Sequence, residues 1–120
     1  MIELDMAQYT AMNDTEAIEQ LQRLMTHKPK RETEPRTKMQ SGALAHGVAA
    51  MQRRGVTWGV NARYLNILAY LAKYDCAVLM QDKNTLAALE TAIGCIKAEQ
   101  QEKARQKHKM FDGMVKEKIW

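Results

Sequence analysis

The sequence contains few of the residues that small proteins use as covalent or metal staples. It has only two cysteines, Cys76 and Cys95, and two prolines in 120 residues. Two cysteines are too few for a disulfide framework, so we expect both to be reduced thiols. A zinc site would need ligands paired at short spacing, and no such cysteine or histidine pair occurs. We therefore expect neither a disulfide scaffold nor a metal site.

Long hydrophobic runs are also missing. The longest uncharged stretch near the middle, residues 64–72, is far shorter than the roughly 20 residues that a membrane span needs. The first ten residues lack the basic region and the apolar run of a secretory signal. We therefore expect a cytoplasmic protein that does not engage a membrane.

The sequence carries no motif of a known catalytic centre. His27, His46 and His108 lie in three separate segments. Cys95 lies in an apolar helical context, where a thiol is usually inert. Residues 42–47 contain two glycines at the spacing of a phosphate-binding loop, but the Lys and the Ser or Thr that must follow are absent. No pair of carboxylates stands out as an acid and a base. We expect a non-enzymatic protein without a cofactor.

The residues that are present favour an all-α fold. Apolar residues make up 46% of the chain and include nine Met but one Phe, which is typical of a helical and adaptable core. A chain of 120 residues has the length of one domain. We predict a single small domain of four to five helices with a long C-terminal helix.

Charge and composition divide the chain into four segments. We predict an acidic segment with one amphipathic helix, a basic proline-containing linker, a helical core and a charged helix with an apolar tail: residues 1–26, 27–40, 41–96 and 97–120. The net charge of +4 is uneven, because residues 1–26 sum to −4 whereas residues 27–38 and residues 97–109 each sum to +3. Any contact with a polyanion should therefore use the middle and the C-terminal third.

The first predicted helix begins near Asn13, whose side chain can cap it, and ends before Pro29. A second helix is expected to run from a Ser41 cap to Gly55, and its many Gly and Ala residues would let a neighbouring helix approach closely. The first helix has one apolar face, made of Ala17, Ile18, Leu21, Leu24 and Met25.

A third helix is expected over residues 61–75, with Asn61 as its cap. It is apolar around most of its circumference, which predicts a position at the centre of the core. Its one polar stripe consists of Arg63, Asn66, Tyr70 and Lys73. The second and third helices have the outline of a helix-turn-helix, but their connection is longer than the usual 3–4 residues. We interpret the stripe as the solvent-facing side of a buried helix rather than as a base-reading surface.

The remaining elements are less sharply specified. Residues 76–80 form a short apolar run that periodicity assigns equally well to a strand or a helix. The last helix is expected to begin near Asn84 or Thr85. Its heptad pattern of apolar residues stops after Ile96, so we do not expect a continuous coiled coil.

Two basic segments predict contact with nucleic acid, because Lys and Arg bind phosphates with an affinity that falls with salt. The predicted contact residues are Lys28, Lys30, Arg31, Arg36, Lys38, Lys103, Arg105, Lys107 and Lys109. Glu32 and Glu34 dilute the first segment, and Glu99 and Glu102 dilute the second. Our leading hypothesis is a small accessory or regulatory protein that contacts nucleic acid non-specifically, without strong base readout.

The apolar C-terminal tail supports an alternative hypothesis. Its predicted partner-binding residues are Met110, Phe111, Met114, Val115, Ile119 and Trp120. Met and aromatic residues are enriched in interface cores, and an apolar tail is costly to expose. The tail would then fold back on the domain, pair with a second copy in a homodimer, or dock on another protein. In the last case the protein is an inhibitor, an adaptor or an assembly factor.

Overall fold

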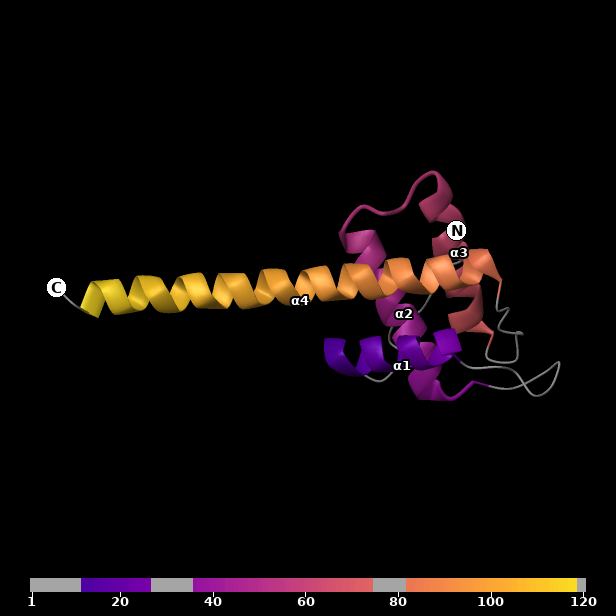
Figure 1. The fold of residues 1–120 in the computed structure, drawn as a ribbon, viewed down its shortest axis with the longest axis horizontal. Helices are drawn as coiled ribbons and strands as arrows, with labels where there is room; N and C mark the ends of the chain where they lie inside the picture. The colour runs from indigo at the N-terminus through magenta and orange to yellow at the C-terminus, as the bar shows by residue number, and fades with distance from the viewer. Residues whose placement is uncertain (1–11, 27–35, 75–81, 119–120) are drawn as a thin grey trace.

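The computed structural model describes residues 12–26, 36–74 and 82–118, with side chains described up to residue 106 in the last range. This part of the chain contains four helices and no strand: α1 (Asp14–Thr26), α2 (Lys38–Arg53), α3 (Val60–Lys73) and α4 (Lys83–Lys118). The predicted all-α fold with a long C-terminal helix is confirmed (Figure 1). The apolar run at residues 76–80 lies outside the described residues, as does Cys76.

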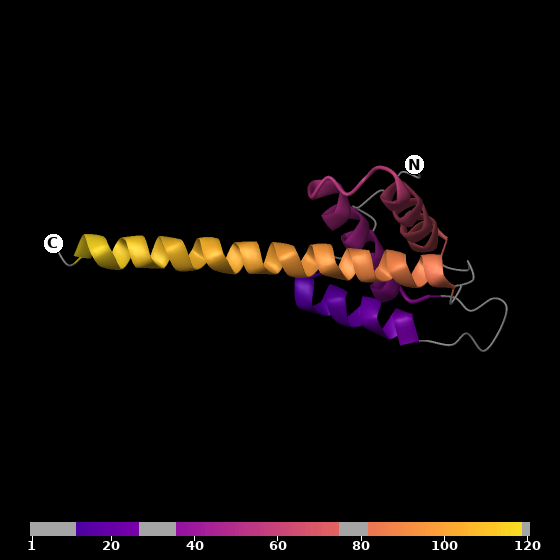
Figure 2. The ribbon, with the colours of Figure 1, turned by 45° about the horizontal axis from the view of Figure 1, so that its top comes forward.

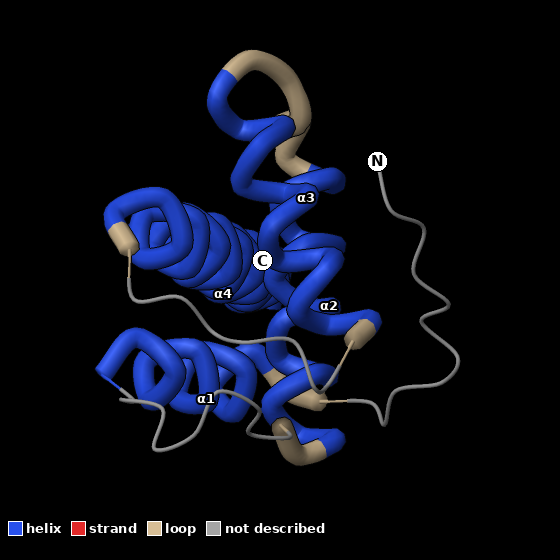
Figure 3. The backbone as a smooth tube through the Cα atoms, turned by 90° about the vertical axis from the view of Figure 1, so that its right-hand side faces the viewer, coloured by secondary structure: helices blue, strands red, loops and turns tan. Residues whose placement is uncertain are grey.

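The four helices form a compact body around a central pair. α2 and α4 lie side by side, and α1 and α3 cover them from opposite sides (Figure 3). α2 and α4 run parallel, because Gly47 lies against Ala92 and Arg53 contacts Glu99 further along both helices. The two outer helices run antiparallel to α2. The body is therefore a central parallel pair with one helix on each side.

The most deeply buried element is α2. It packs against all three other helices, whereas α3 packs mainly against α2 and α4. The prediction that residues 61–75 form the central helix is therefore wrong. The physical reason is size: the small side chains of α2 allow three neighbours to approach it, whereas the larger residues of α3 fill a single flank. The buried residues of α2 are Ser41, Gly42, Ala43, Leu44, Ala45, Gly47, Val48, Ala50 and Met51.

Gly47 marks the closest approach between helices. A Cβ atom placed on Gly47 would lie 2.9 Å from the Cβ of Ala92 on α4 and 3.5 Å from Cδ1 of Leu21 on α1. The first of these distances is too short for two carbon atoms, so only glycine fits here without a shift of α4. The expectation that the small residues of this helix permit close packing is confirmed at this position.

The observed N-terminal cap of α1 agrees with the prediction, whereas that of α2 differs from it. Asn13 caps α1 as predicted, since its side chain accepts a hydrogen bond of 2.8 Å from the backbone N–H of Glu16. The predicted Ser41 cap of α2 is wrong. Thr37 caps this helix and forms a capping box with Gln40, while Ser41 is buried inside the first turns. α2 therefore begins at Lys38, within the segment predicted to be a linker.

The starts of α3 and α4 also differ from the predictions by a few residues. Gly59 rather than Asn61 precedes α3, and its φ of 62° is a backbone conformation that favours glycine. At α4 the Asp82 side chain accepts a hydrogen bond of 2.7 Å from the backbone N–H of Thr85. Asp82 therefore caps α4, which begins at Lys83, one to two residues before the predicted start near Asn84 or Thr85.

The end of α2 follows the predicted position at Gly55. Gly55 has a φ of 73°, and its N–H donates to the carbonyl of Gln52 at 3.1 Å. The N–H of Val56 donates to the carbonyl of Met51 at 2.9 Å, which completes a Schellman motif. This motif turns the chain sharply and lets Val56 pack against the core.

α4 extends well past the body (Figure 2). Among the described side chains, the most C-terminal polar contacts between α4 and another helix are made by Glu102 and Lys103. At about 1.5 Å per residue, the part of α4 from Lys103 to Lys118 is about 22 Å long. The molecule accordingly measures 66 × 29 × 26 Å. Among the described residues, no helix combines the length and the apolar character needed to cross a membrane.

Two helical glycines provide a matched test of the close packing between α2 and α4. We expect Gly94→Ala to raise the free energy of unfolding by about 0.5–1 kcal/mol, because an added Cβ meets nothing within 4 Å and alanine favours the helix. We expect Gly47→Ala to lower it by about 1 kcal/mol, because the clash with Ala92 outweighs the same gain in propensity. Urea denaturation measures both changes. Equal stabilisation by the two variants would contradict the close packing.

Candidate functional site

Arg36, a predicted phosphate contact, is part of the folded core. The residue is only 8% exposed. Its guanidinium donates hydrogen bonds to the backbone carbonyls of Leu71 and of Tyr74, the second at 2.6 Å. These carbonyls lie at the C-terminus of α3, where a helix has unsatisfied acceptors and a partial negative charge. Arg36 therefore fixes the start of α2 to the end of α3, and its charge is not on the surface.

The other predicted contact residues fall into three groups. Lys38 is exposed in the first turn of α2, and Arg105 is exposed on α4. Lys103 forms an ion pair of 3.4 Å with Asp14 of α1. The remaining members lie where the structure describes no side chains: Lys28, Lys30, Arg31, Lys107 and Lys109. Their role in binding stays a prediction.

The structure does not bring the described members of the two basic segments together. Lys38 lies at the start of α2. Lys103 lies beside the later half of that helix, one residue after Glu102, which pairs with Arg54 at its end. α2 is about 24 Å long, so these two lysines belong to different parts of the surface.

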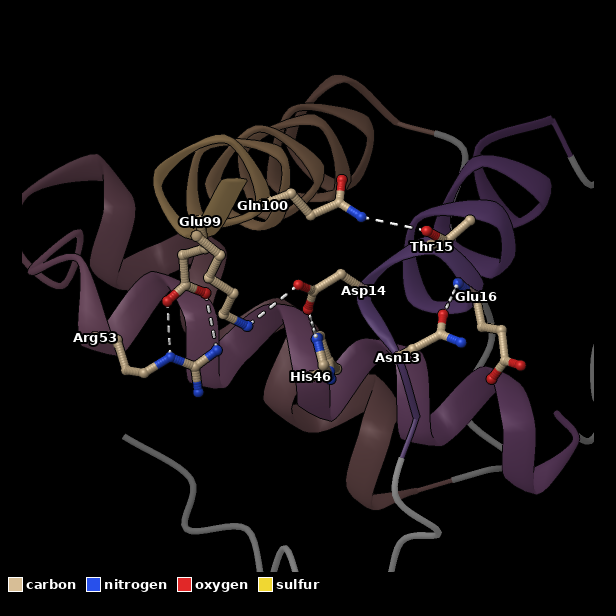
Figure 4. A network of polar contacts seen from close by, with 9 residues as sticks. Asn13, Asp14, Thr15, Glu16, His46, Arg53, Glu99 and Gln100 are labelled. Carbon is tan, nitrogen blue, oxygen red and sulfur yellow. Dashed lines mark hydrogen bonds and ion pairs between the residues drawn. The ribbon is translucent and has the colours of Figure 1, made fainter. Parts of the chain in front are cut away.

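A network of polar contacts joins α1, α2 and α4 (Figure 4). Asp14 accepts from Lys103 on one oxygen, and its other oxygen lies 2.8 Å from Nε2 of His46. Partial burial acts to raise the pKa of the Asp14 carboxyl, but the hydrogen bonds to His46 and Lys103 outweigh it and leave the pKa below its ordinary value. The cation on Lys103 is thus partly neutralised by this carboxylate.

A second part of the network joins the end of α2 to α4. Arg53 donates two hydrogen bonds of 2.9 Å to the two carboxylate oxygens of Glu99, and Arg54 donates one of 2.8 Å to Glu102. The hydrogen bond from Arg53 holds the pKa of Glu99 below its ordinary value. From the sequence alone, these two glutamates are expected only to dilute a basic helix. In the structure they hold α2 against α4.

The partner-binding residues predicted in the C-terminal tail lie beyond the described side chains. Met110, Phe111, Met114 and Val115 occupy positions on α4, and Ile119 and Trp120 lie outside the described residues. In an α-helix, positions 110 and 114 and positions 111 and 115 are neighbours on one face. The protein-interaction hypothesis therefore stays a prediction.

The polar stripe of α3 is the clearest exposed feature of the body. All four of its predicted members are exposed, as is Tyr74 at the end of the helix. We call this surface the α3 face, defined as Arg63, Asn66, Tyr70, Lys73 and Tyr74. Within the described ranges, Arg63 and Lys73 form no ion pair. The two tyrosines are 49% and 47% exposed, so each shows about half of its surface to solvent.

No acidic residue lies between Glu34 and Asp75, so the whole of α2, the following loop and α3 lack negative charge. The same stretch contains six Lys and Arg residues. Three of these are used internally, namely buried Arg36 and the paired Arg53 and Arg54. The other three, Lys38, Arg63 and Lys73, are exposed and pair with no carboxylate of the described residues.

The loop before α3 adds an exposed aromatic side chain. Trp58 is 76% exposed and Val60, the first residue of α3, is 62% exposed. Gly55 and Gly59, at the two ends of this loop, have positive φ values, which favour glycine. The exposure of Trp58 could not be read from the local sequence pattern.

Two features of the described residues bear on nucleophilic and metal chemistry. Cys95 is 7% exposed, and burial raises the pKa of its thiol, so the reactive thiolate is disfavoured. Within the described ranges, no group of three or more His, Cys, Asp or Glu side chains is arranged to hold a metal ion.

A comparison of two neighbouring cations tests the structural role of Arg36. We expect Arg36→Ala to lower the free energy of unfolding by about 2–3 kcal/mol, because it leaves carbonyls at the end of α3 without their charged donor. The control is Lys38→Ala, which removes an exposed cation two residues away and should change stability by less than about 0.5 kcal/mol. Equal effects in urea denaturation would show that Arg36 is not a structural cap.

The network also predicts a dependence of stability on pH. The pKa values of Asp14 and Glu99 lie below the ordinary 3.8 and 4.5, so their contribution is present at neutral pH and is lost as the pH falls through the lowered values. We expect Asp14→Asn with Glu99→Gln to lower the urea midpoint at pH 7 and to have a progressively smaller effect as the pH falls below the ordinary values of these carboxyls. Glu90→Gln, an exposed change on α4, is the control. A difference in urea midpoint between the wild type and the double variant that stays constant with pH would contradict this assignment.

Comparisons of the chain with protein-family models, with curated proteins and with solved structures find no match.

Proposed function

We propose that this protein is a small non-enzymatic accessory protein that contacts nucleic acid through the α3 face. The proposal depends on which cations form ion pairs with carboxylates and which do not. Arg63 and Lys73 are exposed and form no ion pair in the described part of the chain, whereas Arg53, Arg54 and Lys103 are each held by a carboxylate. A cation that no carboxylate holds is available to a phosphate.

The composition of the α3 face supports a nucleic acid over a simple anion. Its two cations stand among an amide and two half-exposed tyrosines, and no acidic residue occurs in α2, the loop or α3. Nucleic-acid surfaces combine positive charge with aromatic and amide side chains in this way. α3 is about 21 Å long, which matches about six nucleotides of one strand at 3.4 Å each.

The proposal moves the leading interface from the two predicted basic segments to α3. Arg36 is buried, and Lys103 is engaged by Asp14, so neither presents a free charge. Lys38 lies near the α3 face, because Arg36 ties the start of α2 to the end of α3. Lys38 can therefore extend the same basic surface.

The salt dependence of binding tests this function. Each phosphate contact contributes about 0.7–0.9 to the slope of log affinity against log salt. We expect wild-type protein to bind a mixed-sequence oligonucleotide at low salt, and we expect Arg63→Ala and Lys73→Ala each to reduce that slope by about this amount. Fluorescence anisotropy of a labelled oligonucleotide measures both the affinity and the slope.

The matched control is Arg23→Ala. It removes the same charge from an exposed helical position on α1, which lies across the α2/α4 pair from α3. Arg23 is paired with Glu19 at 2.7 Å, so its loss should leave the slope unchanged. Absence of binding at low salt, or equal effects of Arg23→Ala and Arg63→Ala, would contradict the proposed function.

A further inference from the structure

We propose that the ligand of the α3 face is single-stranded nucleic acid, with unpaired bases stacked on Tyr70 and Tyr74. This inference rests on the proposed function and specifies the form of nucleic acid that the face recognises. The cations of the face would serve any nucleic acid, because both single strands and duplexes present phosphates. The tyrosines discriminate between them.

The two tyrosines form a contiguous aromatic surface at the C-terminal end of α3. Their ring centroids are 5.0 Å apart with an interplanar angle of 53°, so the rings touch at a tilt and do not cover one another fully. Each residue remains about half exposed. One turn of helix separates them, and α3 is held at this end by the buried guanidinium of Arg36. The backbone that carries both rings is therefore tied to the start of α2.

Lys73 places a positive charge at the same surface. Its Nζ atom lies 5.6 Å from the centroid of the Tyr74 ring. A base stacked on this ring would have its phosphate within reach of the ammonium group, and Arg63 lies two to three turns back along the same helix. Aromatic rings that hold bases, beside cations that hold the backbone, are the combination that single-strand-binding proteins use.

A duplex cannot use the aromatic part of this surface. In a duplex each base face is covered by its neighbours, so a tyrosine ring reaches a base face only if a pair is broken. An unpaired strand exposes its base faces at no such cost. Every base has such a face, so stacking tolerates any sequence. The α3 face should thus prefer single strands while reading little sequence.

The test compares two forms of one oligonucleotide. A labelled strand of about twelve nucleotides, roughly twice the span of α3, is titrated with wild-type protein alone and after annealing to its complement. We expect the single strand to bind at least about tenfold more tightly, since each stacked base contributes about fivefold or more. This measurement requires no variant and so does not depend on the stability of a mutant.

Paired substitutions then identify the rings as the cause. Tyr70→Phe with Tyr74→Phe keeps both aromatic faces and should retain the single-strand affinity within about twofold. Tyr70→Leu with Tyr74→Leu keeps apolar area but removes the faces, and it should lower single-strand affinity about tenfold or more while leaving duplex affinity nearly unchanged. Both positions are exposed, and urea denaturation verifies that each variant is folded.

The outcomes separate this inference from the proposed function. No binding of either form at low salt would remove the proposed function and the inference with it. Equal affinity for the two forms, or equal affinity of the Leu and Phe variants for the single strand, would overturn only the inference. A poly-glutamate peptide that displaces the strand at equal total charge would overturn both the inference and the proposed function, because it would indicate an acidic protein surface as the ligand.

Discussion

The contact between Gly47 of α2 and Ala92 of α4 sets the positions of the other elements. At this point two parallel helices approach so closely that a single methyl group would force them apart. Leu21 of α1 lies against the same glycine, so the first helix is positioned by the same contact. α3 then occupies the opposite flank, where one side packs on the pair and the other remains exposed. The exposed α3 face is thus a consequence of how the centre is packed.

The distribution of charge on the surface differs from the distribution along the sequence. The C-terminal segment reads as basic, yet its glutamates bind the two arginines at the end of α2, and Lys103 binds Asp14. These pairs hold three helices together and use charge that a sequence count would assign to a ligand. α3 has only two cations, but neither is engaged in an ion pair within the described ranges. The pairing of each cation, more than the number of cations, decides where a polyanion can bind.

Features that depend on local sequence could be predicted, and those that depend on distant residues could not. The cap at Asn13, the end of α2 near Gly55 and the exposed stripe of α3 follow from short-range patterns. The role of Arg36 could not be predicted, because its acceptors are backbone carbonyls 35 and 38 residues away. The prediction of the central helix is wrong because high apolar content does not measure depth of burial: the small side chains of α2 let it pack against all three other helices, whereas α3 packs mainly against α2 and α4.

The length of α4 has a mechanical consequence. Its first half is locked to the body by buried residues and ion pairs, and the same helix continues to Lys118 without a break. Each residue of an α-helix advances the chain by about 1.5 Å and turns it by about 100°. Any group carried near residue 118 therefore has a direction fixed by the residue count from the body. Deletion of one residue between the body and residue 118 would rotate that group about the helix axis by about 100° while leaving the body intact.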